Sequence, residues 1–74
     1  MRLDKFLKVN RIIKRRVVAK RAIENGYVLR NGQNTKAGTD INPGDVITVN
    51  FPNRKLKVAV TEDFGVRFLS ETNH

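Results

Sequence analysis

Apolar residues near the start of the chain recur at the spacing of one helix face. Leu3, Phe6 and Leu7 stand at positions i, i+3 and i+4, and the residues between Leu3 and Phe6 are charged. This periodicity places the three side chains on one side of an α-helix. The pattern therefore predicts a short amphipathic helix over residues 3–9.

A second helix is predicted over residues 16–25. Ala19, Ala22 and Ile23 mark its buried face, and Val18 lies beside them. The dipeptide Asn25-Gly26 follows, and glycine readily adopts the left-handed conformation that ends many helices. The helix is therefore expected to stop there.

Beyond Gly26 the apolar residues alternate with the period of a β-strand. Strands are predicted at residues 27–30, 46–51 and 55–60, with a brief return strand over 33–36 and a short edge strand over 66–69. Asn31-Gly32 is a strong signal for a tight hairpin. Residues 42–45, with Pro43 followed by Gly44, predict a second turn.

This order of elements predicts an α+β fold, in which two short N-terminal helices pack on a small, mainly antiparallel sheet of three to five strands. A chain of 74 residues has room for one domain. We expect that domain to span residues 1–69 and residues 70–74 to form a flexible tail. A monomer is expected, because no large exposed apolar stripe is predicted.

Positive charge is concentrated in the first half of the chain. Residues 1–36 hold eleven Lys or Arg residues against two acidic residues, whereas residues 37–74 hold four against five. Such asymmetry predicts one positive face rather than a uniformly charged surface. Polyanions bind such faces by releasing condensed counterions, so nucleic acid is the expected partner.

The residue types that catalysis and metal binding require are scarce. The chain has no Cys, and its one His is His74, the last residue. No Gly-rich phosphate loop precedes a helix. We therefore expect no enzyme, cofactor, metal site or small-molecule substrate. No apolar stretch approaches the ~20 residues of a membrane span, and no secretory signal is apparent, so a cytoplasmic location is expected.

Several motifs in the first fifty residues resemble a known family. They are Arg2-Leu3-Asp4-Lys5-Phe6-Leu7, Arg16 with Ala19, Ile23 with Gly26, Gly26-x-Val28-x-x-Asn31-Gly32 and Pro43-Gly44-Asp45-x-Ile47-x-Val49. In this order and spacing they are similar to the S-four RNA-binding domain, which carries the alpha-L RNA-binding motif. The basic run from Met1 to Arg16 most resembles a standalone bacterial branch that acts in ribosome-associated quality control and is related to a fifteen-kilodalton heat-shock protein.

The resemblance implies a non-catalytic accessory factor that binds structured RNA through the two helices and the loop between them. The implied partners are tRNA, large-subunit ribosomal RNA and the large ribosomal subunit obstructed by a peptidyl-tRNA. At matching positions, Arg2, Asp4 and Arg16 are the expected functional residues. Additional contacts to RNA are expected from Lys5, Lys8, Arg11, Lys14, Arg15 and Lys20.

The chemistry of these residue types suits such a role. An Arg can bind a phosphate through two parallel hydrogen bonds, and the start of a helix offers free backbone N–H groups. Asp4 is unusual in a cationic segment. One interpretation is that Asp4 stabilises the helix dipole. The other is that it orients Arg2 or Arg16, or accepts a hydrogen bond from a ribose or base. The two interpretations are compatible. Arg15 stands where the family often has Ser or Thr, so a hydroxyl cap is not expected there.

Aromatic residues favour one mode of RNA recognition over another. Phe6 and Phe51 lie on apolar faces and are expected in the core, while Tyr27 alternates off the strand face and could be exposed. Stacking of single-stranded bases needs exposed aromatic platforms, so recognition of structured RNA is preferred. Alternatives are a general ribosomal-RNA or tRNA-binding or assembly factor, a DNA-binding protein, and an adaptor that adds a partner strand at residues 66–69.

Overall fold

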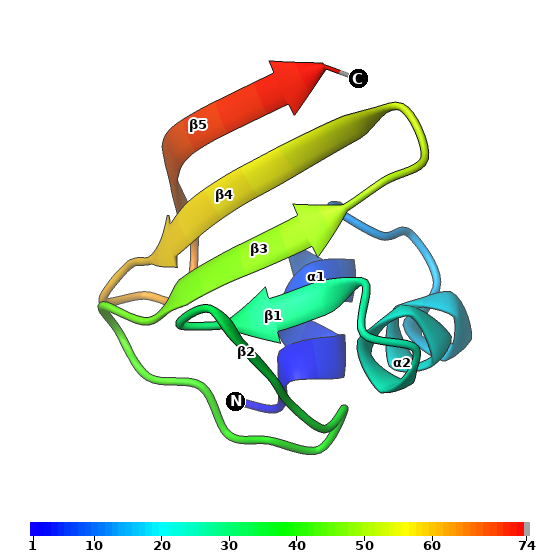
Figure 1. Cartoon of the computed structure of the whole chain (residues 1–74). Coiled ribbons are helices and arrows are strands. Elements are labelled where there is room, and N and C mark those ends of the chain that lie inside the picture. The colour runs from blue at the N-terminus through cyan, green and yellow to red at the C-terminus, as the bar shows by residue number, and fades with distance from the viewer. Residues whose placement is uncertain (74) are drawn as a thin grey trace.

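The helices and strands follow one another in the order that the periodicity predicts. The computed structural model describes residues 1–73. Its elements are α1 (Leu3–Val9), α2 (Arg16–Glu24), β1 (Val28–Arg30), β2 (Gln33–Asn34), β3 (Val46–Asn50), β4 (Arg54–Val60) and β5 (Val66–Asn73) (Figure 1).

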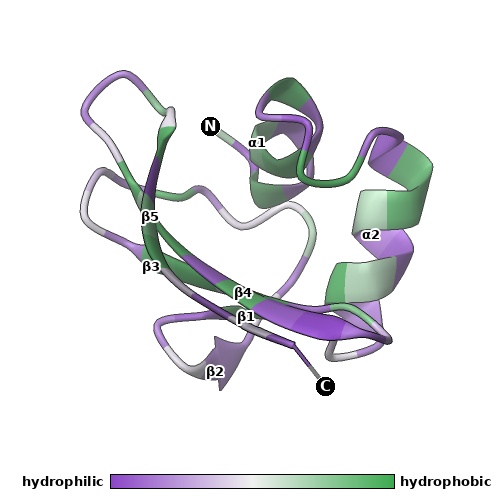
Figure 2. Ribbon diagram, turned by 90° about the horizontal axis from the view of Figure 1, so that it is seen from above, coloured by the Kyte–Doolittle hydropathy of each residue, from purple (hydrophilic) through white to green (hydrophobic). Residues whose placement is uncertain are grey.

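The strands form one five-stranded sheet in the order β2-β1-β3-β4-β5. Every neighbouring pair in this sheet is antiparallel. The sheet is curved, and both helices lie on the same side of it (Figure 2). The predicted α+β architecture of two N-terminal helices on an antiparallel sheet is therefore confirmed.

The core lies between the helices and one face of the sheet. It contains the predicted helix residues Leu3, Phe6, Leu7, Ala19 and Ile23 and the predicted strand residues Ile47, Val49, Leu56, Val58 and Val60. Burial of these alternating side chains supplies the main driving force for folding. Val18, beside the predicted buried face, is 47% exposed.

Two turns set the register of the central strands. Asn31 and Gly32 both have positive φ angles, 52° and 80°, and they join Arg30 directly to Gln33 across the β1–β2 pair. This is the geometry of a type I′ hairpin, as predicted. The predicted turn at residues 42–45 is also present, with Gly44 at φ 92°.

Asp45 ties these two turns together. Its Oδ2 accepts from Arg30 Nε at 2.9 Å and from the backbone N–H of Asn42 at 2.8 Å, and its Oδ1 accepts from Asn31 Nδ2 at 3.2 Å. Burial alone would raise the pKa of Asp45, but these hydrogen bonds and the charge of Arg30 outweigh it and hold the pKa below its ordinary value. Arg30 is thereby engaged in a structural ion pair.

Strand β5 is longer than the sequence pattern predicts. The expected edge strand over 66–69 continues to Asn73, and residues 70–73 pair with residues 54–57 of β4. The pairing skips Leu69, because Phe68 faces Val58 and Ser70 faces Lys57 at a β-bulge. The prediction of a tail starting at Ser70 is therefore corrected for residues 70–73, and His74 lies outside the described residues.

The physical reason for this difference is the exposure of the strand. Residues 67–73 are exposed on an edge of the sheet, so no apolar alternation marks them as a strand. Their pairing rests on the backbone ladder and on an ion pair between Arg54 Nη1 and Glu71 Oε2 at 3.6 Å. Within residues 1–73, no helix is both long and apolar enough to cross a membrane.

We predict that deleting residues 70–74 destabilises the protein by about 1–3 kcal/mol, because several net hydrogen bonds of the β4–β5 ladder are lost. Urea unfolding followed by circular dichroism measures the change. A truncated chain as stable as the full chain would show that residues 70–73 do not contribute to the sheet. Replacing Glu71 with Gln separates the ion pair from the ladder and should cost less than about 1 kcal/mol.

Candidate nucleic-acid interface

A buried carboxylate lies at the centre of the basic segment. Asp4 is in the first turn of α1 and is only 2% exposed. Arg2 donates to its two carboxylate oxygens from Nε at 3.3 Å and from Nη2 at 3.2 Å. Arg16 Nε, at the start of α2, lies 3.3 Å from Oδ2 of the same carboxylate. Asp4 therefore braces both arginines, which was one of the interpretations left open by the sequence.

The environment of Asp4 keeps its carboxyl group ionised. Burial by itself raises the pKa of this group, because the charged form is less well solvated. The hydrogen bond from Arg16, the backbone N–H of Lys5 at 2.8 Å and the charges of Arg16 and Arg2 outweigh this effect. The pKa of Asp4 is consequently lower than its ordinary value.

The two braced arginines still face solvent. The side chain of Arg2 is 50% exposed and that of Arg16 is 45% exposed. A guanidinium has five N–H donors, so each group keeps donors beyond those that contact Asp4. One carboxylate between two guanidinium groups also leaves a net positive charge. This arrangement can therefore present oriented donors to an external phosphate.

A loop far along the chain supports the Arg2 side. The backbone N–H groups of Leu3 and Asp4 donate to the carbonyls of Thr39 and Ala37, at 2.9 and 3.2 Å. The guanidinium of Arg2 lies over Gly38, where a Cβ atom would be 3.6 Å from Nη2. No motif in the sequence marked residues 37–39, because their contribution depends on contacts with residues more than thirty positions away.

The remaining predicted site residues all lie on the surface. Lys5 and Lys8 on α1, Arg11, Lys14 and Arg15 in the connector, and Lys20 on α2 are exposed. Within residues 1–73 none of these six forms an ion pair. Arg15 precedes α2 and makes no side-chain cap, as expected. Arg21 is also exposed on α2 but was not among the predicted site residues. Its position next to Lys20 in the sequence was the signal that could have added it to them.

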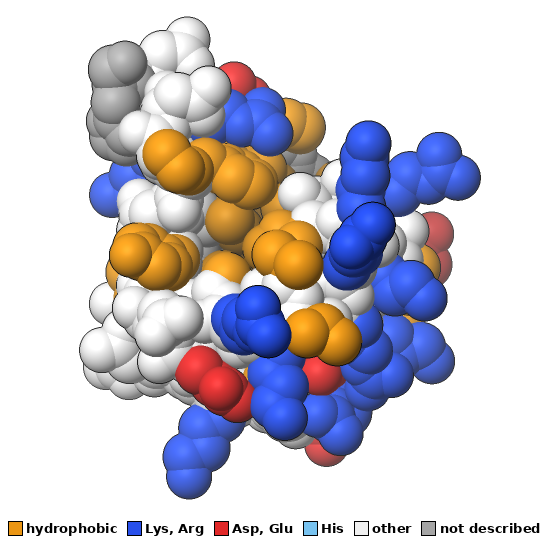
Figure 3. Space-filling model, turned by 90° about the vertical axis from the view of Figure 1, so that its right-hand side faces the viewer, with side chains coloured by type: hydrophobic (Ala, Val, Ile, Leu, Met, Phe, Trp, Pro, Cys, Tyr) orange, Lys and Arg blue, Asp and Glu red, His pale blue; other side chains and the backbone are white. Residues whose placement is uncertain are grey.

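Many of the cations lie close together on the surface of the molecule. Figure 3 shows Lys and Arg side chains crowded along one side of this view, next to a hollow with hydrophobic side chains. We call the nine predicted residues together the cationic face: Arg2, Asp4, Lys5, Lys8, Arg11, Lys14, Arg15, Arg16 and Lys20. The structure joins Arg2, Asp4 and Arg16 by direct contacts. Contact of these residues with RNA stays a prediction.

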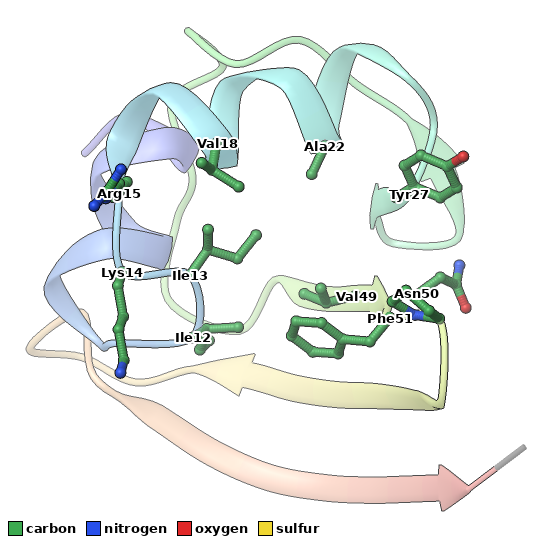
Figure 4. A pocket seen from close by; sticks show the side chains of 11 residues that line it. Ile12, Ile13, Lys14, Arg15, Val18, Ala22, Tyr27, Val49, Asn50 and Phe51 are labelled. Carbon is green, nitrogen blue, oxygen red and sulfur yellow. The ribbon is translucent and has the colours of Figure 1, made fainter.

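The hollow is an apolar groove of about 870 Å³ between α2 and β3. Val18 and Ala22 of α2 form one wall, and Val49 with the adjoining Phe51 forms the other (Figure 4). Phe6 is fully buried, as predicted, and Phe51 is partly buried, packs against the core and also lines this groove. Sequence reasoning missed the groove because its walls come from separate segments.

We predict that Asp4→Asn destabilises the protein by about 1–3 kcal/mol at neutral pH. Removing one partner of a fully buried ion pair costs more, but solvent screens the half-exposed arginines here. Because the folded-state pKa of Asp4 is lowered, its stabilising effect is present above the unfolded-state pKa. That effect is lost as pH falls through the folded-state pKa.

Urea unfolding of the wild type and Asp4→Asn over a pH series measures this difference. The two stabilities should converge as pH falls below the ordinary carboxyl value of 3.8. Glu24→Gln is the matched control, since Glu24 is exposed on α2, and it should stay within about 0.5 kcal/mol of wild type. A stability gap that does not depend on pH would contradict the assigned role of the Asp4 charge.

Comparisons with known proteins agree with this geometry. The model of the S4 domain family matches residues 1–47. The RQC P-site tRNA stabilizing factor of Bacillus subtilis is 50% identical over 62 residues, covering 84% of this chain and 72% of that protein. The protein of the same name from Streptococcus pneumoniae is 48% identical over 62 residues, covering 84% and 70%.

A solved structure shares the fold along the whole chain. The trimeric structure of Vibrio cholerae Heat Shock Protein 15 matches with a TM-score of 0.77 and 27% identity, covering 100% of this chain and 69% of that chain. The sequence matches include the segment that carries Arg2, Asp4 and Arg16. The chain therefore belongs to the S4 domain family and, within it, to the RQC P-site tRNA stabilizing factors.

Proposed function

We propose that this protein binds a tRNA in the P site of an obstructed large ribosomal subunit and stabilises it there through the cationic face. Membership in the family makes the chain a non-enzymatic RNA-binding factor. Relatives that are about half identical are named for stabilising a P-site tRNA. The observation that carries the proposal is the pair of arginines held by the buried carboxylate of Asp4.

The brace suits phosphate binding for two reasons. An arginine that is already oriented loses less conformational freedom when it binds, so more of the interaction energy appears as affinity. Because the Asp4 contacts occupy only part of each guanidinium, Arg2 and Arg16 keep outward N–H groups for phosphate oxygens. The two arginines would thus set the register of the RNA backbone on the protein.

The surrounding cations would extend this contact. Lys5 and Lys8 project from α1, Lys14 and Arg15 from the connector, and Lys20 from α2. Each lysine is a flexible point charge and does not require a fixed phosphate geometry. We propose that the spread over both helices lets the face contact the tRNA and an adjacent ribosomal RNA helix together. The sheet behind the helices would hold the two helices in place.

We predict that Arg16→Glu removes association with the large subunit and also lowers stability, because Asp4 loses one of its two compensating charges. The substitution replaces a side chain that can donate hydrogen bonds to phosphate with one that repels phosphate. It also places this negative charge next to Asp4. Sedimentation of the purified protein with large subunits carrying a peptidyl-tRNA measures association, and circular dichroism checks folding. Arg16→Ala should weaken the association less severely. It can be assayed in place of Arg16→Glu if the charge reversal prevents folding.

Lys57→Glu is the matched control for this charge reversal. Lys57 is exposed on β4, where it alternates with the buried residues Leu56 and Val58 and therefore points away from the helices. This variant should sediment like wild type. If Arg16→Glu sediments normally, or if Lys57→Glu loses association to the same degree, the cationic face is not the binding surface.

We also predict that binding to isolated tRNA is strongly salt-dependent. Six to ten phosphate contacts would lower affinity by about 10³- to 10⁵-fold between 50 and 200 mM salt. Lys20→Ala should weaken binding and reduce the slope of log affinity against log salt by about 1, whereas Lys57→Ala should leave the slope unchanged. Fluorescence anisotropy across a salt series measures the affinity and its slope. An equal slope for Lys20→Ala and wild type would show that Lys20 is not part of the interface.

A further inference from the structure

Two apolar side chains beside the groove are unusually exposed. Val18 is 47% exposed and Tyr27 is 57% exposed, and both line the groove between α2 and β3 (Figure 4). Folding of the described chain leaves them uncovered, although Ala19 and Ile23 on the adjacent side of α2 are buried in the core. An exposed apolar hollow of this kind marks a contact surface for a ligand or partner.

One end of this groove belongs to the cationic face. Lys14 and Arg15 line the groove together with the aliphatic residues, and Figure 4 shows them at the end opposite Tyr27. From Arg15 to Ala22 the helix rises roughly 10 Å, which is the length of one wall. A polyanion held by Lys14 and Arg15 therefore has a direct path into the groove.

The far part of the groove provides aromatic surface. Tyr27 follows α2 and Phe51 follows β3, and the fold brings both to the same groove. The guanidinium of Arg54 lies 4.6 Å from the centroid of the Phe51 ring and helps to fix the orientation of that ring.

These features together match one class of occupant. An unpaired nucleotide has a flat apolar base face, a polar base edge and an attached phosphate. The base face suits Tyr27 and the aliphatic walls, since bases stack on aromatic rings without regard to sequence. The phosphate suits Lys14 and Arg15. An apolar peptide would use the walls but would leave the two cations without a partner.

We propose that the groove between α2 and β3 accepts one or two unpaired nucleotides of the RNA that the cationic face binds. This inference rests on the proposed function and adds to it a preference for RNA with a nucleotide that is free of base pairing. It also changes the expectation drawn from the sequence, in which recognition used only the shape and backbone of structured RNA.

The test compares three RNAs that share one duplex sequence: a fully paired duplex, the duplex with one bulged nucleotide, and the duplex with an abasic bulge. Fluorescence anisotropy with the full chain measures affinity. Wild type should bind the bulged duplex about ten-fold tighter than the other two, because base stacking on protein aromatics supplies that much affinity. The abasic RNA separates the contribution of the base to affinity from the contribution of the more flexible bulged backbone.

Variants of exposed aromatic residues locate the effect. Tyr27→Ala should remove most of the preference for the bulged duplex without changing affinity for the paired duplex, and Tyr27→Phe should retain it. Phe68→Ala is the matched control, because Phe68 is 63% exposed on β5 and does not line the groove. Phe68→Ala should keep the full preference.

The outcomes separate this inference from the proposed function. Equal binding of the three RNAs by wild type, or a preference that survives Tyr27→Ala, overturns the groove assignment while leaving RNA binding intact. Unchanged RNA affinities together with loss of ribosome association in Tyr27→Ala would assign the groove to a protein partner and also overturn it. Arg16→Glu should weaken binding of all three RNAs to the same degree. Unchanged affinities in this variant would contradict the role of the cationic face.

Discussion

The buried charge of Asp4 is the constraint on which the candidate interface depends. A carboxylate that is 2% exposed loses several kcal/mol of hydration and must be compensated by nearby donors and positive charge. Arg2 and Arg16 supply that charge from the two ends of the segment that contains α1 and the connector. The same contact therefore links the starts of the two helices and directs both guanidinium groups.

The starts of α1 and α2 differ in how their first backbone N–H groups are bonded. The first N–H groups of α1 are bonded to carbonyls of residues 37 and 39, so the protein itself satisfies them. Helix α2 begins after Arg15 without a side-chain cap, at the point where positive side chains are densest. Free N–H groups, the positive end of the helix dipole and two adjacent arginines then act on the same region of space. The start of α2 is consequently the better position for an anion.

In the binding that we propose, the cationic face and the apolar groove act over different distances. Charges act over about a Debye length and orient an approaching polyanion, whereas the groove acts only on a group that enters it. Lys14 and Arg15 belong to both surfaces. Strand β3 carries the wall residue Val49, and Phe51 follows the end of this strand. This arrangement joins salt-sensitive attraction to contacts that depend on the form of the ligand.

The sequence by itself determined the two helices, the central strands, the two turns and most of the core, because each depends on periodicity or on a conformational preference of neighbouring residues. It also indicated that Asp4, Arg2 and Arg16 act together. Only the tertiary structure decided that Asp4 is buried between both arginines, that Arg2 packs over Gly38, and that Tyr27 and Phe51 meet in one groove. The strand at residues 70–73 belongs to this second group. These features arise from contacts between distant segments, and an exposed edge strand buries no alternating side chains, so no local pattern records them.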